Sequence, residues 1–468
     1  MTYLFVGAGQ AGSAIVDSIF EHTSGSFLGL FDSPDISTIG QPIVFNSTIR
    51  DLQNLSNVPP EAQFGVSEHH GLIQGTAPGF EEKVTGGFGR NPVEADQVMD
   101  THSGEVRNIL TDWYGPPSGG SPTAAVETDG GNVLGEPEAD VDEEPDESTH
   151  QIDETAQAQT REHTGSEETP QAQSREHTGG ADLQFAFLFL GLGGGTGCGI
   201  APHLAREIKA YTDGRTQVIA FAVLPNLGGD GGDGGAGRQA WNARYGLNRL
   251  EETVDGIVLV DNQRISYLNS AGGEFGEYNE YVAGAVHDII AGPVLSSVDA
   301  SQIEGFDTPD IDIRDILTSL QFGVGEETYE TGYAAIGRSV TMTKSLAGYL
   351  LPVVGKRDVD SAALARLAAS KQTLADADVT DSEKAIVLIR SPKSSLSGGV
   401  NGVEPGTIKE FFERSCGLGE VNVGVALSDR NLISVSALLT YRRENISRLE
   451  EIEAKAEEYE TETREVVQ

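Results

Sequence analysis

The chain has 468 residues, and its 72 acidic and 31 basic side chains give it a formal net charge of −41. This charge argues against nucleic-acid binding through backbone phosphates, which needs a surplus of cations. Only nine of the basic residues are lysines. Because salt screens the self-repulsion of such an acidic surface, we expect a protein adapted to high salt. The length suffices for two or three ordinary domains.

The sequence offers no sign of export or of a membrane anchor. Its two cysteines, Cys198 and Cys416, are too few for a disulfide framework. The first residues lack the basic segment and cleavage site of a signal peptide. No apolar run approaches the roughly 20 residues that span a bilayer. We therefore expect a cytoplasmic protein without an integral membrane segment.

The chain opens with an apolar segment, a glycine loop at residues 7–12 (GAGQAG) and a helical pattern. Two more apolar segments end at Asp32 and Asn46. A second glycine loop, at residues 84–92, precedes a helix that we expect to reach about Trp113. The first 35 residues alone are also typical of a dinucleotide-binding oxidoreductase, since GxGxxG follows a strand and Asp32 ends the next one.

Residues 115–182 differ in composition from the rest of the chain. Between positions 121 and 182 there are 17 acidic residues and two arginines, and an 11-residue pattern at 155–165 recurs with small changes at 169–179. Such a polar, charged segment cannot bury enough apolar surface to fold, so we predict a disordered acidic insertion that is available to protein partners.

The strongest motif is FAFLFLGLGGGTGCGI at residues 185–200. An apolar, aromatic run predicts a buried strand, and the glycines that follow leave the backbone open to an approaching group. A helical pattern comes next. Strand, glycine loop and helix start together predict an anion-binding nest of backbone N–H groups. A Walker loop is excluded, because no lysine follows the glycines.

The rest of the chain alternates predicted strands and helices. We expect strands at 216–225 and 256–262, with a glycine–aspartate loop at 228–237, a helix from about Trp241, and helical segments to about residue 301. Further strands are expected at 332–342, 384–390, 421–427 and 432–442, with a helix near 406–413. The chain ends in a charged helix with Ile446, Leu449 and Ile452 on one side, which we expect at the surface or against a partner.

The motif GGGTGCG resembles the signature of the tubulin/FtsZ superfamily of polymerising GTPases. The loop at 7–12 resembles the GxGQAG loop of the same family, and the similarity, over about 300 residues, is closest to the CetZ group of haloarchaea. The resemblance implies an α/β fold with a Rossmann-like parallel-sheet GTPase domain, a core helix and a smaller α/β C-terminal domain. We assign these parts to residues 1–114 and 183–262 (GTPase domain), 115–182 (insertion), 263–306 (core helix region), 307–440 (C-terminal domain) and 441–468 (charged helical tail).

The resemblance also implies which residues hold GTP or GDP. Residues of four loops would surround the phosphates: Gly9, Gln10, Ala11, Gly12, Asn46, Gly89, Arg90, Asn91, Gly193, Gly194, Gly195, Thr196 and Gly197. Asn242 and Asn262 would contact guanine, since an amide both donates and accepts hydrogen bonds. Either asparagine alone is equally typical of a helix cap. The ribose contacts implied for Asp230, Asp233 or Arg238 depend on a weaker match.

The family's catalytic loop, N-x-D-x-x-D, is similar to Asp310, Asp312 and Asp315 here, with aspartate in place of the asparagine. The resemblance implies that these carboxylates act on the γ-phosphate of a neighbouring subunit, with Mg²⁺ on the phosphates and no protein metal ligands. The alternative is an acidic cap of the helix that follows.

The prediction is therefore a GTPase that assembles head to tail with copies of itself, in a cytoskeletal role in cell shape or division. Two alternatives stay open. One is an NAD-dependent oxidoreductase, and the other is a homologue that binds GTP without hydrolysing it and acts as a structural or regulatory protein.

Overall fold

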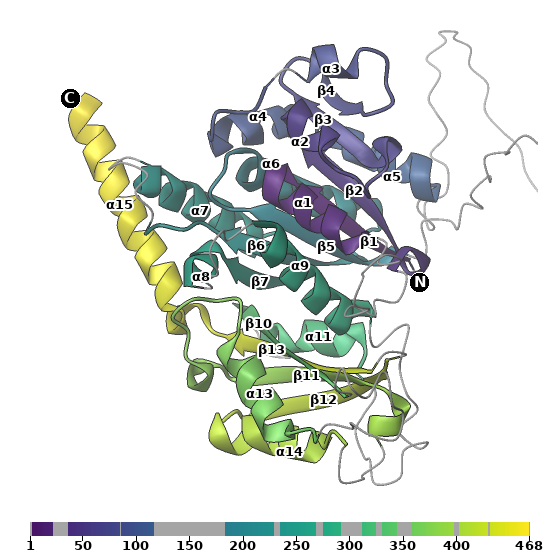
Figure 1. The fold of residues 1–468 in the computed structure, drawn as a ribbon. Helices are drawn as coiled ribbons and strands as arrows, with labels where there is room; N and C mark the ends of the chain where they lie inside the picture. The colour runs from purple at the N-terminus through teal and green to yellow at the C-terminus, as the bar shows by residue number, and fades with distance from the viewer. Residues whose placement is uncertain are drawn as a thin grey trace, which may run out of the picture. The chain divides into compact units, whose positions relative to one another are not determined.

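A computed structural model describes most of the chain (Figure 1). The described residues are 2–21, 36–84, 86–116, 183–228, 235–267, 275–291, 311–323, 330–343, 358–396, 402–428 and 431–467. Several expectations fall outside these ranges: the apolar segment that ends at Asp32, the acidic insertion from residue 117 to 182, the residues Asp230 and Asp233, and Asp310.

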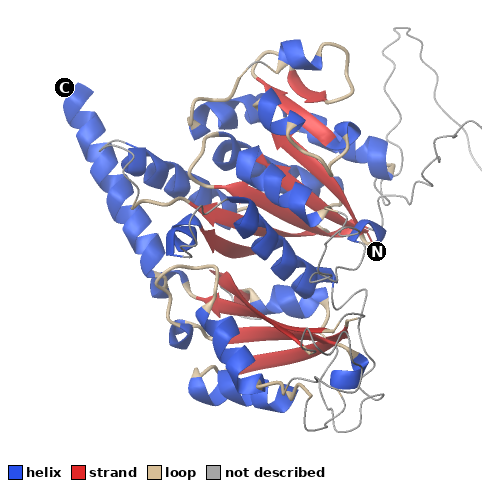
Figure 2. Ribbon diagram, in the orientation of Figure 1, coloured by secondary structure: helices blue, strands red, loops and turns tan. Residues whose placement is uncertain are grey.

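The described strands form one eleven-stranded sheet and a two-stranded ribbon. Strands are the red arrows in Figure 2. The order in the large sheet is β12-β11-β13-β10-β7-β6-β5-β1-β2-β3-β4, and only β13 and β4 run against their neighbours. The strands are β1 (Thr2–Ala8), β2 (Gly40–Asn46), β3 (Gln63–Ser67), β4 (Gly71–Gln74), β5 (Leu183–Gly191), β6 (Gln217–Leu224), β7 (Gly256–Asp261), β10 (Tyr333–Met342), β11 (Lys384–Ser391), β12 (Glu420–Leu427) and β13 (Leu432–Tyr441), with β8 (Gln321–Phe322) and β9 (Glu330–Thr331) in the ribbon.

The central strands are apolar throughout because both faces of the sheet are covered. Along β1, Tyr3 and Phe5 enter one hydrophobic cluster, whereas Leu4 and Val6 enter the other. The aromatic rings gather on the first of these faces, where Phe5 lies 5.3 Å from Phe187 between ring centroids. An α/β fold with a large, mostly parallel sheet follows from this two-sided burial.

Helices cover each face of the sheet. Those that contribute buried side chains to the aromatic face are α1 (Gly9–Ile19), α2 (Ile49–Gln53), α3 (Phe80–Lys83), α9 (Phe275–Val286) and α11 (Ile313–Ser319). Those on the other face are α4 (Pro92–His102), α5 (Gly104–Tyr114), α6 (Thr196–Tyr211), α7 (Gly235–Glu251), α13 (Ser361–Ser370), α14 (Pro405–Glu410) and α15 (Ser447–Val467). Helix α8 (Asn262–Tyr267) follows β7, and π-helical turns follow α9 (His287–Ala291) and α14 (Phe411–Ser415).

Some elements differ from expectation. The helix expected from residue 92 to about Trp113 is two helices, α4 and α5, which meet at Ser103. Helix α7 begins at Gly235, six residues before Trp241. The β3–β4 hairpin and α13 were not predicted, because short strands and an alanine-rich helix carry little periodic signal.

The C-terminal helix α15 is more than a surface helix. Leu449 and Ile452 of α15, and Ile446 directly before it, are buried, and α15 packs along α7, as the yellow helix in Figure 1 shows. The helix therefore lies at the surface, as expected, with its apolar side packed against α7 of the same chain. Within the described part of the chain, each helix is too short or too polar to cross a membrane.

Candidate functional site

Four loops meet at one edge of the large sheet because β1, β2 and β5 are parallel and end there together. We name them the first glycine loop (residues 7–12), the asparagine loop (46–48), the arginine loop (86–91) and the main glycine loop (192–197). Gly9 has a φ of +69°, and a Cβ there would lie 2.9 Å from the backbone nitrogen of Gly197. The first and main glycine loops are therefore in direct backbone contact, which only glycine permits.

The main glycine loop leads from β5 into α6, a helix of 16 residues. A Cβ on Gly195 would lie 2.5 Å from the backbone nitrogen of Asn91, whereas a Cβ on Gly194 would meet no described atom within 4 Å. The Thr196 hydroxyl, at the first residue of α6, lies 2.7 Å from the Ser47 hydroxyl of the asparagine loop. This open backbone at a helix N-terminus has the chemistry of a phosphate site.

The arginine loop places two consecutive residues in the left-handed region. Gly89 has a φ of 54° and Arg90 a φ of 64°. For a residue with a side chain this conformation is uncommon, and it is frequent at functional sites. Asn91 caps α4 by accepting a hydrogen bond from the Val93 N–H at 3.2 Å. The guanidinium of Arg238, on α7, donates to the Gly89 carbonyl at 3.1 Å, so the loop is held from two sides.

The first glycine and asparagine loops contain the remaining predicted phosphate residues. Gln10 is exposed, and Ala11 is half-buried, in the first turn of α1. A Cβ on Gly12 would lie 2.0 Å from the Phe189 carbonyl oxygen, so this glycine lets α1 approach β5. Asn46 is buried and its Oδ1 accepts from the Thr48 N–H at 3.2 Å. The structure thus brings all of the predicted phosphate residues to one edge.

The two predicted guanine residues lie in different surroundings. Asn242 is fully buried, and its Nδ2 donates to the carbonyls of Arg90 (3.0 Å) and Gly193 (3.3 Å). Its Oδ1 has no hydrogen-bond partner among the described residues. Asn242 therefore links the arginine loop to the main glycine loop. Asn262 begins α8, directly after β7. Base contact by either residue stays a prediction.

The sequence did not predict a buried ion pair that lies beside Asn262. Asp261 accepts from Arg448 Nε at 2.9 Å, and Arg448 also donates to the Pro225 carbonyl at 2.6 Å. Burial raises the pKa of Asp261, and Arg448 opposes this effect. The pair fixes the carboxyl ends of β6 and β7 to the start of α15. No sequence signal links Asp261 to Arg448, because they are 187 residues apart.

Helix α15 also forms one wall of a pocket of about 740 Å³ next to the arginine loop. The sequence did not suggest this. The pocket lies between α7, α15 and the start of α4, and its lining residues are Arg90, Asn91, Pro92, Arg238, Trp241, Asn242, Tyr459, Glu460, Thr463 and Arg464.

The candidate catalytic acids lie at the other end of the sheet. Asp312 caps α11: its Oδ1 accepts from the N–H groups of Arg314 (2.7 Å) and Asp315 (3.0 Å), and Asp315 Oδ2 accepts from the Asp312 N–H at 2.8 Å. Both carboxylates are exposed. Burial, and then the charge of Asp312, raises the pKa of Tyr3 at the amino end of β1. Within one copy of the chain, these acids therefore lie away from the glycine loops, because the loops follow the carboxyl end of β1.

Comparison with known proteins gives consistent matches. A model of the GTPase domain of the tubulin/FtsZ family matches residues 148–269. The tubulin-like protein CetZ3 of Haloferax volcanii is 27% identical over 285 residues, which cover 58% of this chain and 66% of that protein. The tubulin-like protein CetZ of Pyrococcus furiosus is 31% identical over 131 residues, 28% of this chain and 32% of that protein. The aligned residues thus span less than two thirds of each of these two relatives, 66% and 32%.

Solved structures agree in fold. A GDP-bound monomer of Haloferax volcanii CetZ1 superposes with a TM-score of 0.59 at 18% identity, covering 98% of this chain and all of the other. A GTPγS-bound protofilament of CetZ2 from the same organism gives 0.59 at 18% identity, with 99% and 100% covered.

The fold is that of tubulin/FtsZ-like proteins, so the predicted fold class is confirmed. In sequence, part of the chain matches the GTPase domain of the tubulin/FtsZ family, and the chain is similar to CetZ proteins, as the loop motifs indicated.

Proposed function

We propose that the protein binds GTP, assembles head to tail, and hydrolyses GTP to GDP and phosphate where two copies meet, in a cytoskeletal role in cell shape or division. The observation that carries the proposal is that the glycine loops and the candidate catalytic acids lie at opposite ends of one sheet. The glycine loops lie at the carboxyl ends of the parallel strands, and Asp312 and Asp315 lie at the amino ends. Stacking one copy on the next would bring the acids of one to the loops of the other.

The chemistry of these loops suits the binding of a nucleoside triphosphate. Backbone N–H groups at the start of α6 would bind phosphate oxygens, and the guanidinium of Arg90 would add positive charge beside them. Magnesium supplies charge neutralisation on the phosphates of such a nucleotide. It would be held mainly by phosphate oxygens, because the residues of these four loops include no carboxylate, and the loops offer hydroxyls such as those of Ser47 and Thr196.

The acids suit activation of water. A carboxylate that accepts a proton from water, or orients it, favours attack of the water oxygen on the γ-phosphorus. The bond from that phosphorus to the β–γ bridging oxygen then breaks, GDP leaves with the bonding pair, and the proton passes to solvent. The helix cap uses one oxygen of each carboxylate, Asp312 Oδ1 and Asp315 Oδ2, so capping and catalysis do not compete for the same atom.

The test is GTP hydrolysis measured against protein concentration in about 3 M KCl with Mg²⁺, where salt screens the acidic surface. We expect specific activity to rise with concentration and to be lost in Asp312→Ala and Asp315→Ala. Asp360→Ala is the matched control, because Asp360 caps α13 by accepting from the Ala363 N–H. It should lose about 1 kcal/mol of stability and keep its activity.

The other outcomes separate the alternatives. GTP binding without turnover at any protein concentration would indicate a non-hydrolysing structural or regulatory protein. Binding of NAD in place of GTP would indicate the oxidoreductase.

A further inference from the structure

A buried carboxylate joins α4 and α6, which begin at the arginine loop and the main glycine loop, to α7, which contacts these two loops through Arg238 and Asn242. Asp96 lies on α4, one turn after the arginine loop, and is 7% exposed. Its Oδ1 accepts from His203 Nε2 of α6 at 2.6 Å, and its Oδ2 accepts from the Tyr245 hydroxyl of α7 at 2.7 Å. Arg249, also of α7, donates to Oδ1.

The groups around Asp96 have defined protonation. Arg206 donates to His203 Nδ1 at 3.3 Å, which leaves the proton of a neutral imidazole on Nε2, the atom that faces Asp96. Burial lowers the pKa of His203, so the neutral form is favoured. Burial, with the hydrogen bond to Asp96, raises the pKa of Tyr245 to about 12. His203 and Tyr245 therefore each donate a hydrogen bond to Asp96.

These contacts do not make a metal site. Asp96, Asp100 and His203 form a grouping of metal-ligating side chains in the described part of the chain. However, both oxygens of Asp96 already accept hydrogen bonds, and the guanidiniums of Arg206 and Arg249 would repel a cation.

We infer that Asp96 is a positioning residue that holds the arginine loop against the main glycine loop and so sets the preference for GTP over GDP. The inference rests on the proposed function. Helix α4 begins at Pro92, directly after the arginine loop, and α6 begins at Thr196 in the main glycine loop. Helix α7 contacts both loops through Arg238 and Asn242, and Asp96 is hydrogen-bonded to both α6 and α7.

The arginine loop and the main glycine loop are in direct contact. The backbone of Gly195 lies against Asn91, Arg238 donates to the Gly89 carbonyl, and Asn242 donates to the carbonyls of Arg90 and Gly193. A small rotation of α4 would break these contacts. It would move Arg90 away from a terminal phosphate, because Arg90 directly precedes the first turn of α4. The first glycine loop, which belongs to α1, would keep its place.

The test compares binding of GTPγS and of GDP by titration calorimetry at fixed high salt with Mg²⁺. For Asp96→Asn we expect GTPγS affinity to fall about tenfold or more, equal to about 1.4 kcal/mol, with GDP affinity changed less than threefold. Asp100→Asn is the matched control: it is one turn further along α4, 3.8 Å from His203 Nε2, with its side chain 66% exposed. It should leave both affinities within twofold of the unmodified protein.

Tyr245→Phe is the second variant. It removes one hydrogen bond to Asp96 and keeps the ring that stacks on Trp241 with centroids 5.6 Å apart, so the fold should persist. We expect it to weaken GTPγS binding a few-fold without weakening GDP binding. If Asp96→Asn does not fold, this variant decides.

Equal loss of both nucleotides in a folded Asp96→Asn, or no loss in either variant, would overturn the inference. Failure of the unmodified protein to bind either nucleotide would instead overturn the proposed function.

Discussion

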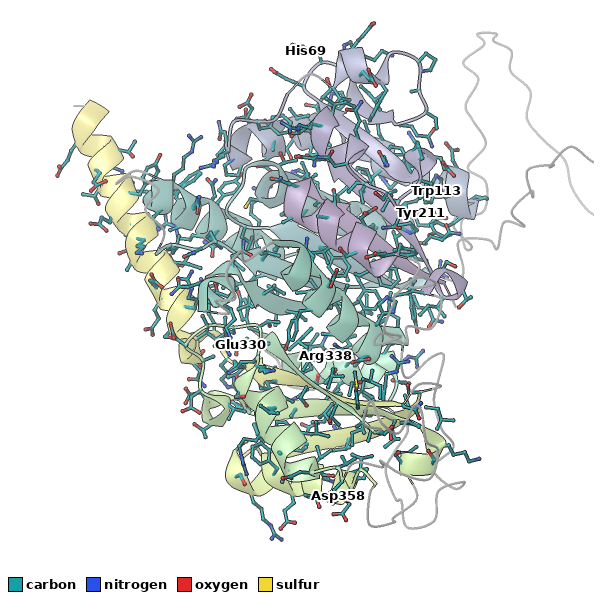
Figure 3. The ribbon with its side chains drawn as sticks, viewed as in Figure 1. His69, Trp113, Tyr211, Glu330, Arg338 and Asp358 are labelled. Carbon is teal, nitrogen blue, oxygen red and sulfur yellow. The ribbon has the colours of Figure 1, made fainter. Side chains whose placement is uncertain are left out.

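Two buried aspartates, Asp96 and Asp288, each accept hydrogen bonds from three side chains. Asp96 connects helices to one another, whereas Asp288 connects a helical turn to strands. Asp288 lies in the π-helical turn after α9 and accepts from Arg338 Nε (2.7 Å), Arg390 Nη1 (3.1 Å) and the Ser436 hydroxyl (2.9 Å). These partners belong to β10, β11 and β13, and Arg338 is labelled in Figure 3.

The surroundings of the two aspartates explain the difference in role. Asp288 is joined to residues within strands, whereas Asp96 joins α4, α6 and α7, which begin at the arginine and main glycine loops or contact them. Loss of Asp288 would weaken packing between the turn and the sheet, and loss of Asp96 would move loops. The effect of a buried carboxylate on function therefore depends on which parts of the helices or strands it holds in place. It does not depend on the number of hydrogen bonds that the carboxylate accepts.

The largest expected effect is on stability. Asp288→Asn should lower the free energy of unfolding by about 3–5 kcal/mol, because it leaves two buried guanidiniums without their counter-charge. Urea unfolding at fixed salt measures this. Ser436→Ala, which removes one hydroxyl partner, should cost about 1 kcal/mol. If Asp288→Asn changes the preference for GTPγS over GDP as Asp96→Asn does, the two aspartates do not have different roles.

The second effect is a loss of stability in acid. Burial alone would raise the pKa of Asp288, but Arg338 and Arg390 outweigh it and lower the pKa to about 2. Because the folded pKa lies below the unfolded value of 3.8, the stabilisation is complete above pH 4 and is lost as the pH falls toward 2. It amounts to about 2 kcal/mol. Unfolding measured from pH 5 to pH 2 should show this component in the unmodified protein, and its persistence in Asp288→Asn would contradict the assignment.

A third effect tests the loops directly. Gly195→Ala places a methyl group 2.5 Å from the Asn91 nitrogen, whereas Gly194→Ala places it in open space. We expect Gly195→Ala to separate the arginine loop from the main glycine loop and to weaken GTPγS binding about tenfold, or about 1.4 kcal/mol. Gly194→Ala should leave the melting temperature unchanged. Equal melting temperatures and GTPγS affinities for Gly195→Ala and the unmodified protein would contradict the close contact.

The smallest expected effect is the coupling between the two aspartates. Among the described residues, Asp96 and Asp288 share no hydrogen-bond partner, and they lie on elements that cover opposite faces of the sheet. The loss of stability in the double variant should equal the sum of the single losses within about 0.5 kcal/mol. A larger coupling, measured by the same urea unfolding, would show that the two networks act as one.

Local sequence was sufficient for the parts of this protein that depend on backbone. The apolar strands and the glycines at 7–12 and 193–197 are contiguous, and their chemistry is that of the main chain, so a short window contains the whole signal. The same window could not separate a cap from a catalytic group at Asp312, because the carboxylate suits both.

Side-chain networks were decided only by the tertiary structure. The partners of Asp96 lie 107, 149 and 153 residues away along the chain, and Arg448 lies 187 residues from Asp261. A hydrogen bond between side chains requires only that the folded chain bring two atoms within about 3 Å. No periodicity or spacing in the sequence reveals such a contact. The sequence therefore predicted the glycine loops as a phosphate site, and the tertiary structure decided which side chains hold those loops in place.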